Sequence, residues 1–271
     1  MKNIRKALEV RRRPVRLADW SPRSTPGCKD RDEATKRLAA NLERIDALQY
    51  ALYAEGRRSL LIVLQGMDTS GKDGVIRKVM TGFNPSGCKV WPFKQPSAEE
   101  SAHDFLWRIH HAAPARGQVA IFNRSHYEDV LVVRVHGLVP PEVWEQRYHS
   151  INLFEEHLHM HGTRILKFFL HLSREEQRDR LLARLDEPDK HWKFSEDDLA
   201  ERQRWPEYAK AYEDAIGKCS PKHARWFVIP SDRKWYRDLA ISEIVREALE
   251  EMDPHPPRVK LDVKKLRRML S

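Results

Sequence analysis

The chain has 271 residues and carries 49 Lys and Arg against 40 Asp and Glu, a formal excess of nine positive charges. This length suits one α/β domain with a large core, and the charge suits an anionic partner such as a nucleotide, a nucleic acid or polyphosphate. No apolar run approaches 18 residues, so no membrane span is expected, and three widely separated cysteines favour a reducing cytoplasm.

The first 30 residues are basic and contain three prolines, which predicts an irregular N-terminal arm. Its arginines could touch a polyanion, although a solvated or subunit-docking extension is the favoured interpretation. From Asp32 to Gly56, apolar residues recur at helical spacing, and the glycine predicts where this long helix ends. We expect the main domain to span residues 31–252, followed by a basic C-terminal tail over 253–271.

A glycine-rich stretch follows this helix and carries the clearest chemical signal. Leu60–Leu64 is an apolar run typical of a buried strand, and apolar residues at helical spacing resume at Val75. A strand, a glycine-rich loop, a lysine and a helix form the context of a phosphate-binding loop, in which backbone N–H groups and the helix N-terminus attract phosphate. The alternative is a turn that only joins strand to helix. The candidate phosphate-binding residues are Gly66, Ser70, Gly71, Lys72, Asp73 and Gly74.

The match to G-x-x-x-x-G-K-[ST] is incomplete, because Asp73 stands where a hydroxyl ligand for Mg²⁺ is usual. Asp68 lies inside the loop instead. A carboxylate in a phosphate cradle repels phosphate unless a cation lies between them, so Asp68 is interpreted as a metal ligand.

Four more strands are expected, alternating with helices, which predicts a three-layer α/β sandwich with a mostly parallel sheet. The strands are expected over 89–93, 118–122, 164–172 and 225–230, and the helices over 97–111, 141–161, from 173, 195–208 and 231–252. The first of these helices has a capping box, Ser97 with Glu100. Three histidines near the end of the second alternate at two-residue spacing, which points them in different directions and argues against a metal site.

A polar cluster follows the third strand directly, where open parallel sheets bind ligands. Arg124 is the best candidate for a second phosphate contact, because a guanidinium pairs bidentately with phosphate oxygens. Its alternative is a structural ion pair with Glu128 or Asp129.

Basic residues gather again between the fourth and fifth strands, over about 178–205. Interleaved leucines and a break at Pro188 predict a basic helix–loop–helix, the place where P-loop kinases carry a mobile lid. The alternative is a solvated basic face. The candidate phosphate contacts of this lid are Arg178, Arg184, Lys190 and Lys193, with Arg180 beside them.

Together these stretches resemble the family-2 polyphosphate kinases. The resemblance rests on GMDTSGKDG, FKQPSAEE, HDFLWRIH, FNRSHYEDV and RLDEPDKHWKF, and extends roughly from Leu17 to Met252. It implies a P-loop kinase core similar to thymidylate kinase, Mg²⁺ with Mn²⁺ as a substitute, and a homodimer or homotetramer. It also implies phosphoryl transfer between inorganic polyphosphate and AMP, ADP or ATP, with GMP and GDP as further candidates.

Position by position, the resemblance implies catalytic roles for Asp68, Lys72 and Arg124. It implies nucleotide contacts at Lys94, Asn123, Arg124 and Glu128. Ser70 departs from the family's usual alanine. Asn123 with Glu128 resembles the branch that accepts both AMP and ADP, whereas the ADP-specific branch has aspartate before the arginine.

Three other functions stay open. An ATP-dependent nucleotide kinase would use the same fold, but more often has Ser or Thr after the loop lysine. A nucleic-acid-binding P-loop protein has only the charge in its favour, so no nucleic-acid partner is expected. A non-catalytic scaffold would have no use for Lys72 and Asp68.

Overall fold

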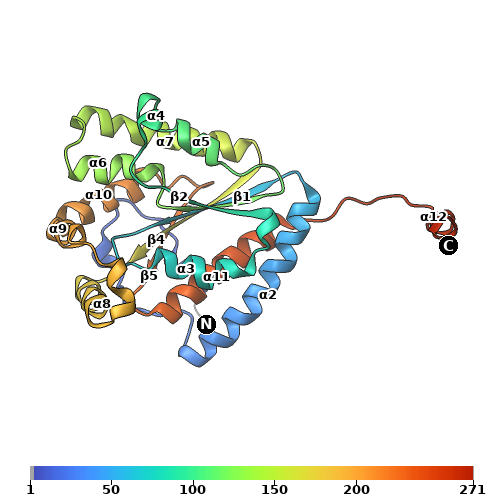
Figure 1. Ribbon diagram of the computed structural model, residues 1–271, viewed down its shortest axis with the longest axis horizontal. Helices are drawn as coiled ribbons and strands as arrows, with labels where there is room; N and C mark the ends of the chain where they lie inside the picture. Colours follow the sequence, from blue (N-terminus) through green and yellow to red (C-terminus); the bar gives the residue numbers. More distant parts are fainter. Residues whose placement is uncertain (1–2, 271) are drawn as a thin grey trace.

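The computed structural model describes residues 3–270 and contains one five-stranded sheet in which every named strand is parallel to its neighbours (Figure 1). The strand order is β2-β3-β1-β4-β5. The strands are β1 (Ser59–Gln65), β2 (Cys88–Pro92), β3 (Val119–Asn123), β4 (Thr163–His171) and β5 (Trp226–Pro230). The predicted parallel α/β sandwich is confirmed.

The central strand β1 is buried along its whole length, because helices cover both faces of the sheet. Leu60, Ile62 and Leu64 pack with α2, α3 and α11 on one face, while Leu61 and Val63 pack with α7 and α10 on the other. The helices are α1 (Ile4–Leu8), α2 (Arg31–Glu55), α3 (Lys72–Lys78), α4 (Ala98–Ala102), α5 (Trp107–Ala112), α6 (Val132–Val135), α7 (Pro141–Met160), α8 (Arg174–Asp186), α9 (Asp197–Gln203), α10 (Trp205–Lys218), α11 (Lys234–Met252) and α12 (Val263–Leu270).

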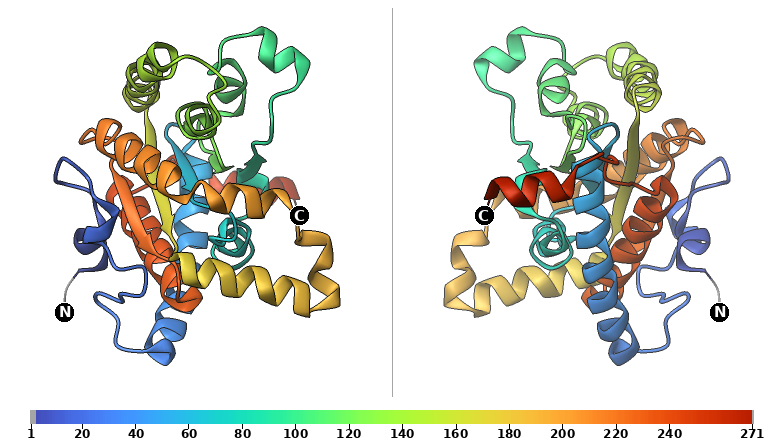
Figure 2. Two further views of the ribbon diagram at one scale, coloured as in Figure 1. Left: turned by 90° about the vertical axis from the view of Figure 1, so that its left-hand side faces the viewer. Right: turned by 90° about the vertical axis from the view of Figure 1, so that its right-hand side faces the viewer.

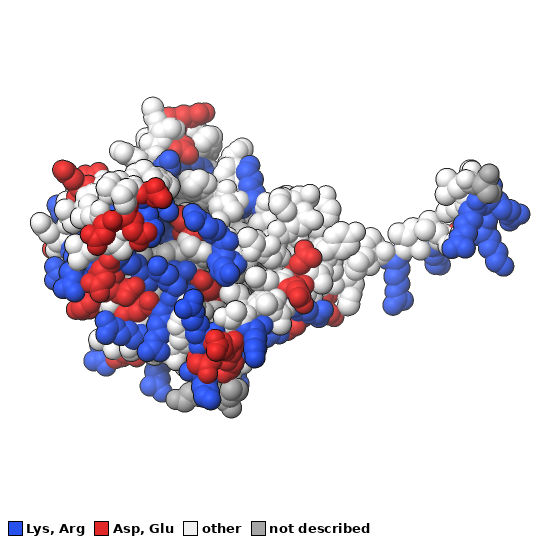
Figure 3. All heavy atoms as spheres, turned by 60° about the horizontal axis from the view of Figure 1, so that its bottom comes forward, with Lys and Arg blue, Asp and Glu red and all other residues white. Residues whose placement is uncertain are grey.

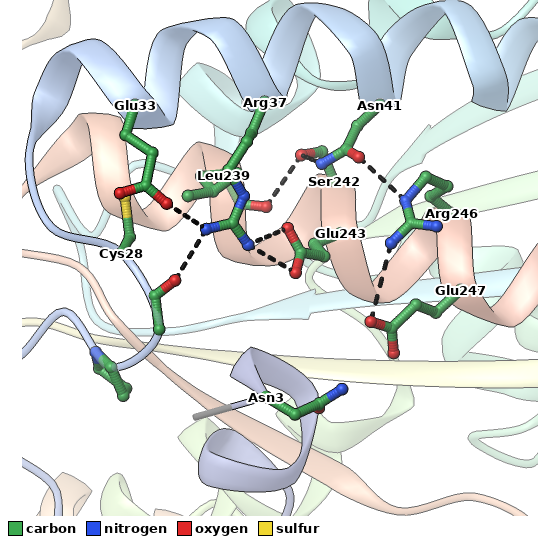
Figure 4. Close-up of polar contacts among 12 residues, drawn as sticks. Asn3, Cys28, Glu33, Arg37, Asn41, Leu239, Ser242, Glu243, Arg246 and Glu247 are labelled. Carbon is green, nitrogen blue, oxygen red and sulfur yellow. Dashed lines mark hydrogen bonds and ion pairs between the residues drawn. The ribbon is translucent and has the colours of Figure 1, made fainter. Parts of the chain in front are cut away.

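The two longest helices of the first face, α2 and α11, are also joined by polar contacts (Figure 4). Arg37 donates to both carboxylate oxygens of Glu243, at 2.7 and 2.6 Å, and to Glu33 on its own helix. Asn41 bridges Ser242 and Arg246 of α11. As predicted, α2 ends at Gly56, which has a left-handed φ of 63°.

The N-terminal arm differs from the expectation of a solvated extension. Ile4 and Leu8 of α1 are each 1% exposed and belong to the core beside α11, and Val10 and Leu17 are also buried. The Val10 amide donates to the Trp226 carbonyl at 2.9 Å. The apolar residues between the arginines therefore bind the arm to its own domain, beyond the open side of β5.

Two predicted helices are each broken in two. The helix expected over 97–111 forms α4, with the predicted capping box, and then a separate α5. The Asp104 carboxylate accepts from the Leu106 amide and starts a new turn there, and α4 has no buried residue that would hold the chain straight. The helix expected over 195–208 is likewise divided at Arg204, because Pro206 opens the new helix α10.

At the C-terminal end, Met252 closes α11 and the chain leaves the body as an extended segment that ends in α12 (Figures 1 and 2). No helix within residues 3–270 has the length and apolar character needed to cross a membrane.

Candidate active site

The glycine-rich loop joins the end of β1 to the start of α3, in the predicted arrangement. Gly71 precedes α3 with φ of 101°, and a Cβ atom there would lie 1.9 Å from a guanidinium nitrogen of Arg237. The left-handed backbone strongly favours glycine at this position, and any side chain would also require the Arg237 guanidinium to move. The hydroxyl of Thr69 is buried and has no partner among the described residues. The loop therefore offers unpaired donors around the N-terminus of α3.

Lys72 is the first residue of α3, and its side chain folds back under the loop. Its ammonium donates to the carbonyls of Gly66 at 2.8 Å and Met67 at 3.4 Å. Burial lowers the pKa of this ammonium, while the charge of Asp68 acts in the opposite direction. A buried positive charge held only by neutral carbonyls is well suited to bind an anion.

Arg124 follows β3, the neighbour of β1 in the sheet, and its guanidinium donates to the Asp68 carboxylate at 2.9 Å. Its backbone has a left-handed φ of 64°, which is unusual for a residue with a side chain. The Arg124 amide holds this turn by donating to the Leu64 carbonyl at 3.0 Å. Next to it, Asn123 donates to the Asp73 carboxylate at 2.8 Å, so the end of β3 and the first turn of α3 present one polar surface.

These groups open into a cleft of about 620 Å³, bounded by the glycine loop, the ends of β2 and β3, and the lid helices. Nine basic and three acidic side chains line it, so the cleft has a strong positive excess. The basic residues are Lys72, Lys94, Arg124, Arg180, Arg184, Lys190, Lys193, Lys234 and Arg237. Such a cleft attracts a ligand that carries several negative charges.

Helix α8 supplies the lid arginines at a spacing of one helical turn. Arg180 donates to the Thr69 carbonyl at 2.9 Å and to the Ser231 carbonyl at 2.6 Å, which ties the lid to the glycine loop. Arg184, four residues on, donates to the Lys193 carbonyl and to Asp198. Arg178 lies on another side of the helix, where it pairs with Asp179 and is 62% exposed.

Two carboxylates in or beside this cleft have raised pKa values. Burial, followed by the charge of Asp68, raises the pKa of Asp198 on α9. Burial also raises the pKa of Glu128, against the charges of Arg124 and Lys72. Residues 3–270 contain no group of three or more His, Cys, Asp or Glu placed to hold a metal. However, Mg²⁺ commonly takes one or two carboxylates and completes its shell with water and substrate phosphate, and Asp68 fits that use.

Most of the predicted site residues lie together. Asp68, Gly71, Lys72, Asp73, Gly74, Lys94, Asn123, Arg124, Arg184, Lys190 and Lys193 all line the cleft. Four predicted residues do not line it. The Gly66 carbonyl instead accepts the bond from Lys72, and the Ser70 hydroxyl is buried with no partner among the described residues. Arg178 pairs with Asp179 in a largely exposed position, and Glu128 is half-buried beside the cleft.

The cleft is also lined by Asp198, Lys234 and Arg237, which are not among the predicted site residues, and by Arg180, which is predicted only as part of the basic lid. The four-residue spacing of Arg180 and Arg184 places both on one helix face, which favours a role for both. Lys234 and Arg237 follow β5, two strands away from the loop, and no local pattern identifies them.

The comparisons with known proteins agree with this geometry. A sequence model of the family Polyphosphate kinase 2 (PPK2) matches residues 28–257. The AMP/ADP-polyphosphate phosphotransferase of Meiothermus ruber is 51% identical over 83% of this chain and 84% of its own length. The ADP-polyphosphate phosphotransferase of Rhodopseudomonas palustris is 46% identical over 88% and 86%. The crystal structure of polyphosphate kinase 2 from Arthrobacter aurescens TC1 matches 99% of this chain and 96% of that one, with a TM-score of 0.96 and 42% identity. This chain belongs to the polyphosphate kinase 2 family.

Proposed function

We propose that this protein transfers phosphoryl groups between inorganic polyphosphate and nucleotides, converting AMP to ADP and ADP to ATP. The observation that carries the proposal is the cleft itself, where nine cations surround a phosphate-binding loop. A donor that is a long polyanion and an acceptor that ends in phosphate both need such a site. Two relatives that are similar along most of this chain are named for polyphosphate with AMP/ADP or with ADP.

The reaction is an in-line displacement. A terminal phosphate oxygen of the nucleotide attacks the end phosphorus of polyphosphate, one P–O bond forms, and the anhydride bond to the shortened polyphosphate breaks. The attacking oxygen is already ionised at neutral pH, so the site needs no strong general base. The obstacle is repulsion between two polyanions, and catalysis consists of positioning and charge neutralisation.

The residues of the cleft divide this task by their positions. Lys72 and the amides at the start of α3 face the transferred group from the glycine loop, because they lie around that loop. Arg124 approaches from the end of β3. Arg180 and Arg184 approach from the lid, on one face of α8. When bound near Asp68, Mg²⁺ would neutralise phosphate oxygens, and Asp198 faces the same space from the lid.

The test is a transfer assay with purified full-length protein, Mg²⁺, AMP and long-chain polyphosphate, without ATP, in which nucleotides are separated over time. We expect ADP first and ATP later. The same assay compares the wild type with Lys72→Ala, which removes the lysine of the glycine loop. Lys78→Ala is the matched control, because Lys78 lies on the same helix, is exposed and does not line the cleft. The control should retain activity.

Each other outcome removes a defined part of the proposal. If AMP is untouched while ADP becomes ATP, the acceptor is ADP alone. If AMP reacts only after ATP is added, the donor is ATP and the protein is an ATP-dependent nucleotide kinase. Omitting Mg²⁺ and adding a chelator should abolish transfer, and undiminished transfer would exclude a metal requirement.

A further inference from the structure

The C-terminal arm, residues 255–270, has a surface that the proposed reaction does not use. Every residue of this arm is exposed, and Figures 1 and 3 show it projecting from the body with its basic side chains at the tip. The family model ends at residue 257, whereas the match to the Arthrobacter aurescens structure covers 99% of this chain and so extends into the arm.

The arm is amphipathic, which a freely solvated tail need not be. In α12, Val263, Leu266 and Leu270 recur at helical spacing and form one apolar face, 52%, 42% and 90% exposed. Four of the other five positions are basic, Lys264, Lys265, Arg267 and Arg268, and the fifth is Met269, which is 71% exposed. In the extended part, Val259 and Leu261 alternate with charged residues and are 69% and 61% exposed. The arm therefore carries a row of apolar side chains that the described part of the chain leaves largely exposed.

An isolated helix of eight residues is only marginally stable in water. The Asp262 side chain caps α12 by accepting from the Lys265 amide at 3.0 Å, but one cap contributes only about 1 kcal/mol. A helix in this position implies a surface that covers its apolar face. The ten extended residues 253–262 reach about 33 Å, which carries α12 beyond its own domain.

The outer side of α2 offers a complementary surface. Ala39, Glu43, Asp46, Tyr50 and Tyr53 follow one another at helical spacing along its exposed stripe. The two tyrosines are 65% and 48% exposed, and two carboxylates lie between them and the start of the helix. Small and aromatic side chains suit the apolar face of α12, and the carboxylates suit its lysines and arginines.

The position of this stripe relative to the arm points to a second copy of the chain. The arm begins next to the end of α2, where Arg58 donates to the Met252 carbonyl. Because the root of the arm and the tyrosines of α2 are neighbours, a twofold axis near them would let two copies exchange arms, each reaching the other's α2. We propose that the C-terminal arm is an exchanged docking arm, and that α12 of one copy packs on the outer stripe of α2 in a second copy. The proposal does not rest on the catalytic activity.

The test measures the mass of the full-length protein in solution by light scattering and sedimentation over a range of concentrations. We expect an oligomer of the 31.9 kDa chain. The arm variant Leu266→Glu with Leu270→Glu, and the surface variant Tyr50→Glu with Tyr53→Glu, should each weaken association at least tenfold. Leu138→Glu is the matched control, because Leu138 is 64% exposed but belongs to neither surface, and its mass should not change.

A crosslinking experiment tests the pairing directly. Chains carrying Leu266→Cys are mixed with chains carrying Tyr50→Cys and oxidised with copper phenanthroline, and we expect a covalent dimer of the two. Replacing the second chain with one carrying Leu138→Cys should give none.

Three results would overturn the proposal. The first is a single-chain mass at all concentrations, and the second is an oligomer that the arm variant leaves unchanged. The third is an oligomer sensitive to the arm but not to Tyr50 and Tyr53, without the Leu266–Tyr50 crosslink. Binding of a single-chain protein to phosphatidylserine vesicles, lost in the arm variant, would assign the arm to a membrane surface instead.

Discussion

Two lysines in this protein, the fully buried Lys167 and the half-buried Lys72, differ in what surrounds them. Lys167 of β4 is 0% exposed and uses all three of its protons, donating to Glu155 at 2.5 Å, Tyr127 at 2.9 Å and the Cys219 carbonyl at 2.7 Å. Lys72 of the glycine loop has two carbonyl partners and, among the described residues, no carboxylate within ion-pair distance.

This difference separates a structural charge from a functional one. Burial by itself raises the pKa of Glu155, but the Lys167 ammonium and the hydrogen bond from His126 outweigh it, so the pair remains ionised and neutral overall. At Lys72 the burial penalty is compensated only partly, and it lowers the pKa of the ammonium. An anionic ligand supplies the missing compensation at Lys72, whereas Lys167 has no place for one.

Replacing Lys72 with methionine should have the largest effect on activity. Loss of this charge should lower turnover about a thousandfold, since it stabilises negative charge in the transition state. The free energy of unfolding should change by less than about 1 kcal/mol, because the variant also removes a costly buried charge. Turnover and urea unfolding of the same samples measure both quantities, with Lys78→Met as control. A stable Lys72→Met variant with the turnover of the wild type would show that Lys72 only stabilises the loop.

Replacing Lys167 with methionine should give the opposite pattern. The Glu155 carboxylate would then be buried without its partner, which costs about 3–5 kcal/mol of unfolding free energy. Turnover per folded molecule should stay near that of the wild type. Lys167→Met with Glu155→Gln should recover part of the stability, because no unpaired charge is left. A lone Lys167→Met variant as stable as the wild type would show that the network adds nothing to stability.

The sequence predicts the environment of Lys72 but not that of Lys167, for a physical reason. Lys72 belongs to a motif that is complete within about twenty residues, from strand to helix, so local pattern determines its environment. Lys167 lies in an apolar strand, and its partners come from α7, from the turn after β3 and from the end of α10. Only the packing of these elements brings them together, and that is not visible in spacing.

The distinction between local pattern and packing also explains which lid residues the sequence predicts correctly. The sequence predicts a basic helix between β4 and β5, but the direction of each side chain depends on how that helix packs on the domain. Arg178 is a predicted phosphate contact but does not line the cleft, whereas Arg180, predicted only as part of the basic lid, binds the glycine loop. Apolar spacing does not show the two helix breaks. The break at His103 depends on a local turn, and the break at Arg204 depends on a proline at the start of α10.

The lid arginines lie between these two cases, because each donates to backbone carbonyls and also pairs with one carboxylate, Arg180 with Glu176 and Arg184 with Asp198. Arg184→Ala should lower kcat/KM for polyphosphate about thirtyfold, or about 2 kcal/mol, through loss of a charged contact. The effect on nucleotide KM should be smaller. Arg178→Ala is the control on the same helix, and steady-state kinetics with each substrate varied measures both. Equal losses for the two substrates would indicate that Arg184 only maintains the fold of the lid.

Asn123 tests whether charge near the acceptor sets the choice of nucleotide. In the wild type its amide donates to Asp73, and Asn123→Asp would place two carboxylates in contact. We expect the ratio of AMP to ADP use to fall about tenfold, since the added charge disturbs the polar surface at the end of β3. Initial rates with each nucleotide at equal concentration measure the ratio. An unchanged ratio would exclude this position as a determinant of acceptor choice.

The smallest predicted effect concerns His126, which adjoins the Lys167 network and is 0% exposed. Burial lowers the pKa of this imidazole, outweighing the hydrogen bond and the charge of Glu155. The unfolded chain therefore binds a proton near pH 6.5 before the native protein does, so the free energy of unfolding should fall as pH drops below 6.5. One such group contributes at most about 1.4 kcal/mol per pH unit. Urea unfolding between pH 7.5 and 5.5 should show a shallower decline for His126→Gln, in which the other histidines still titrate. If the unfolding free energy of the wild type and of His126→Gln fell equally steeply with pH, His126 would bind its proton as readily in the folded protein as in the unfolded chain. The surroundings of Lys167 would then accommodate a second positive charge.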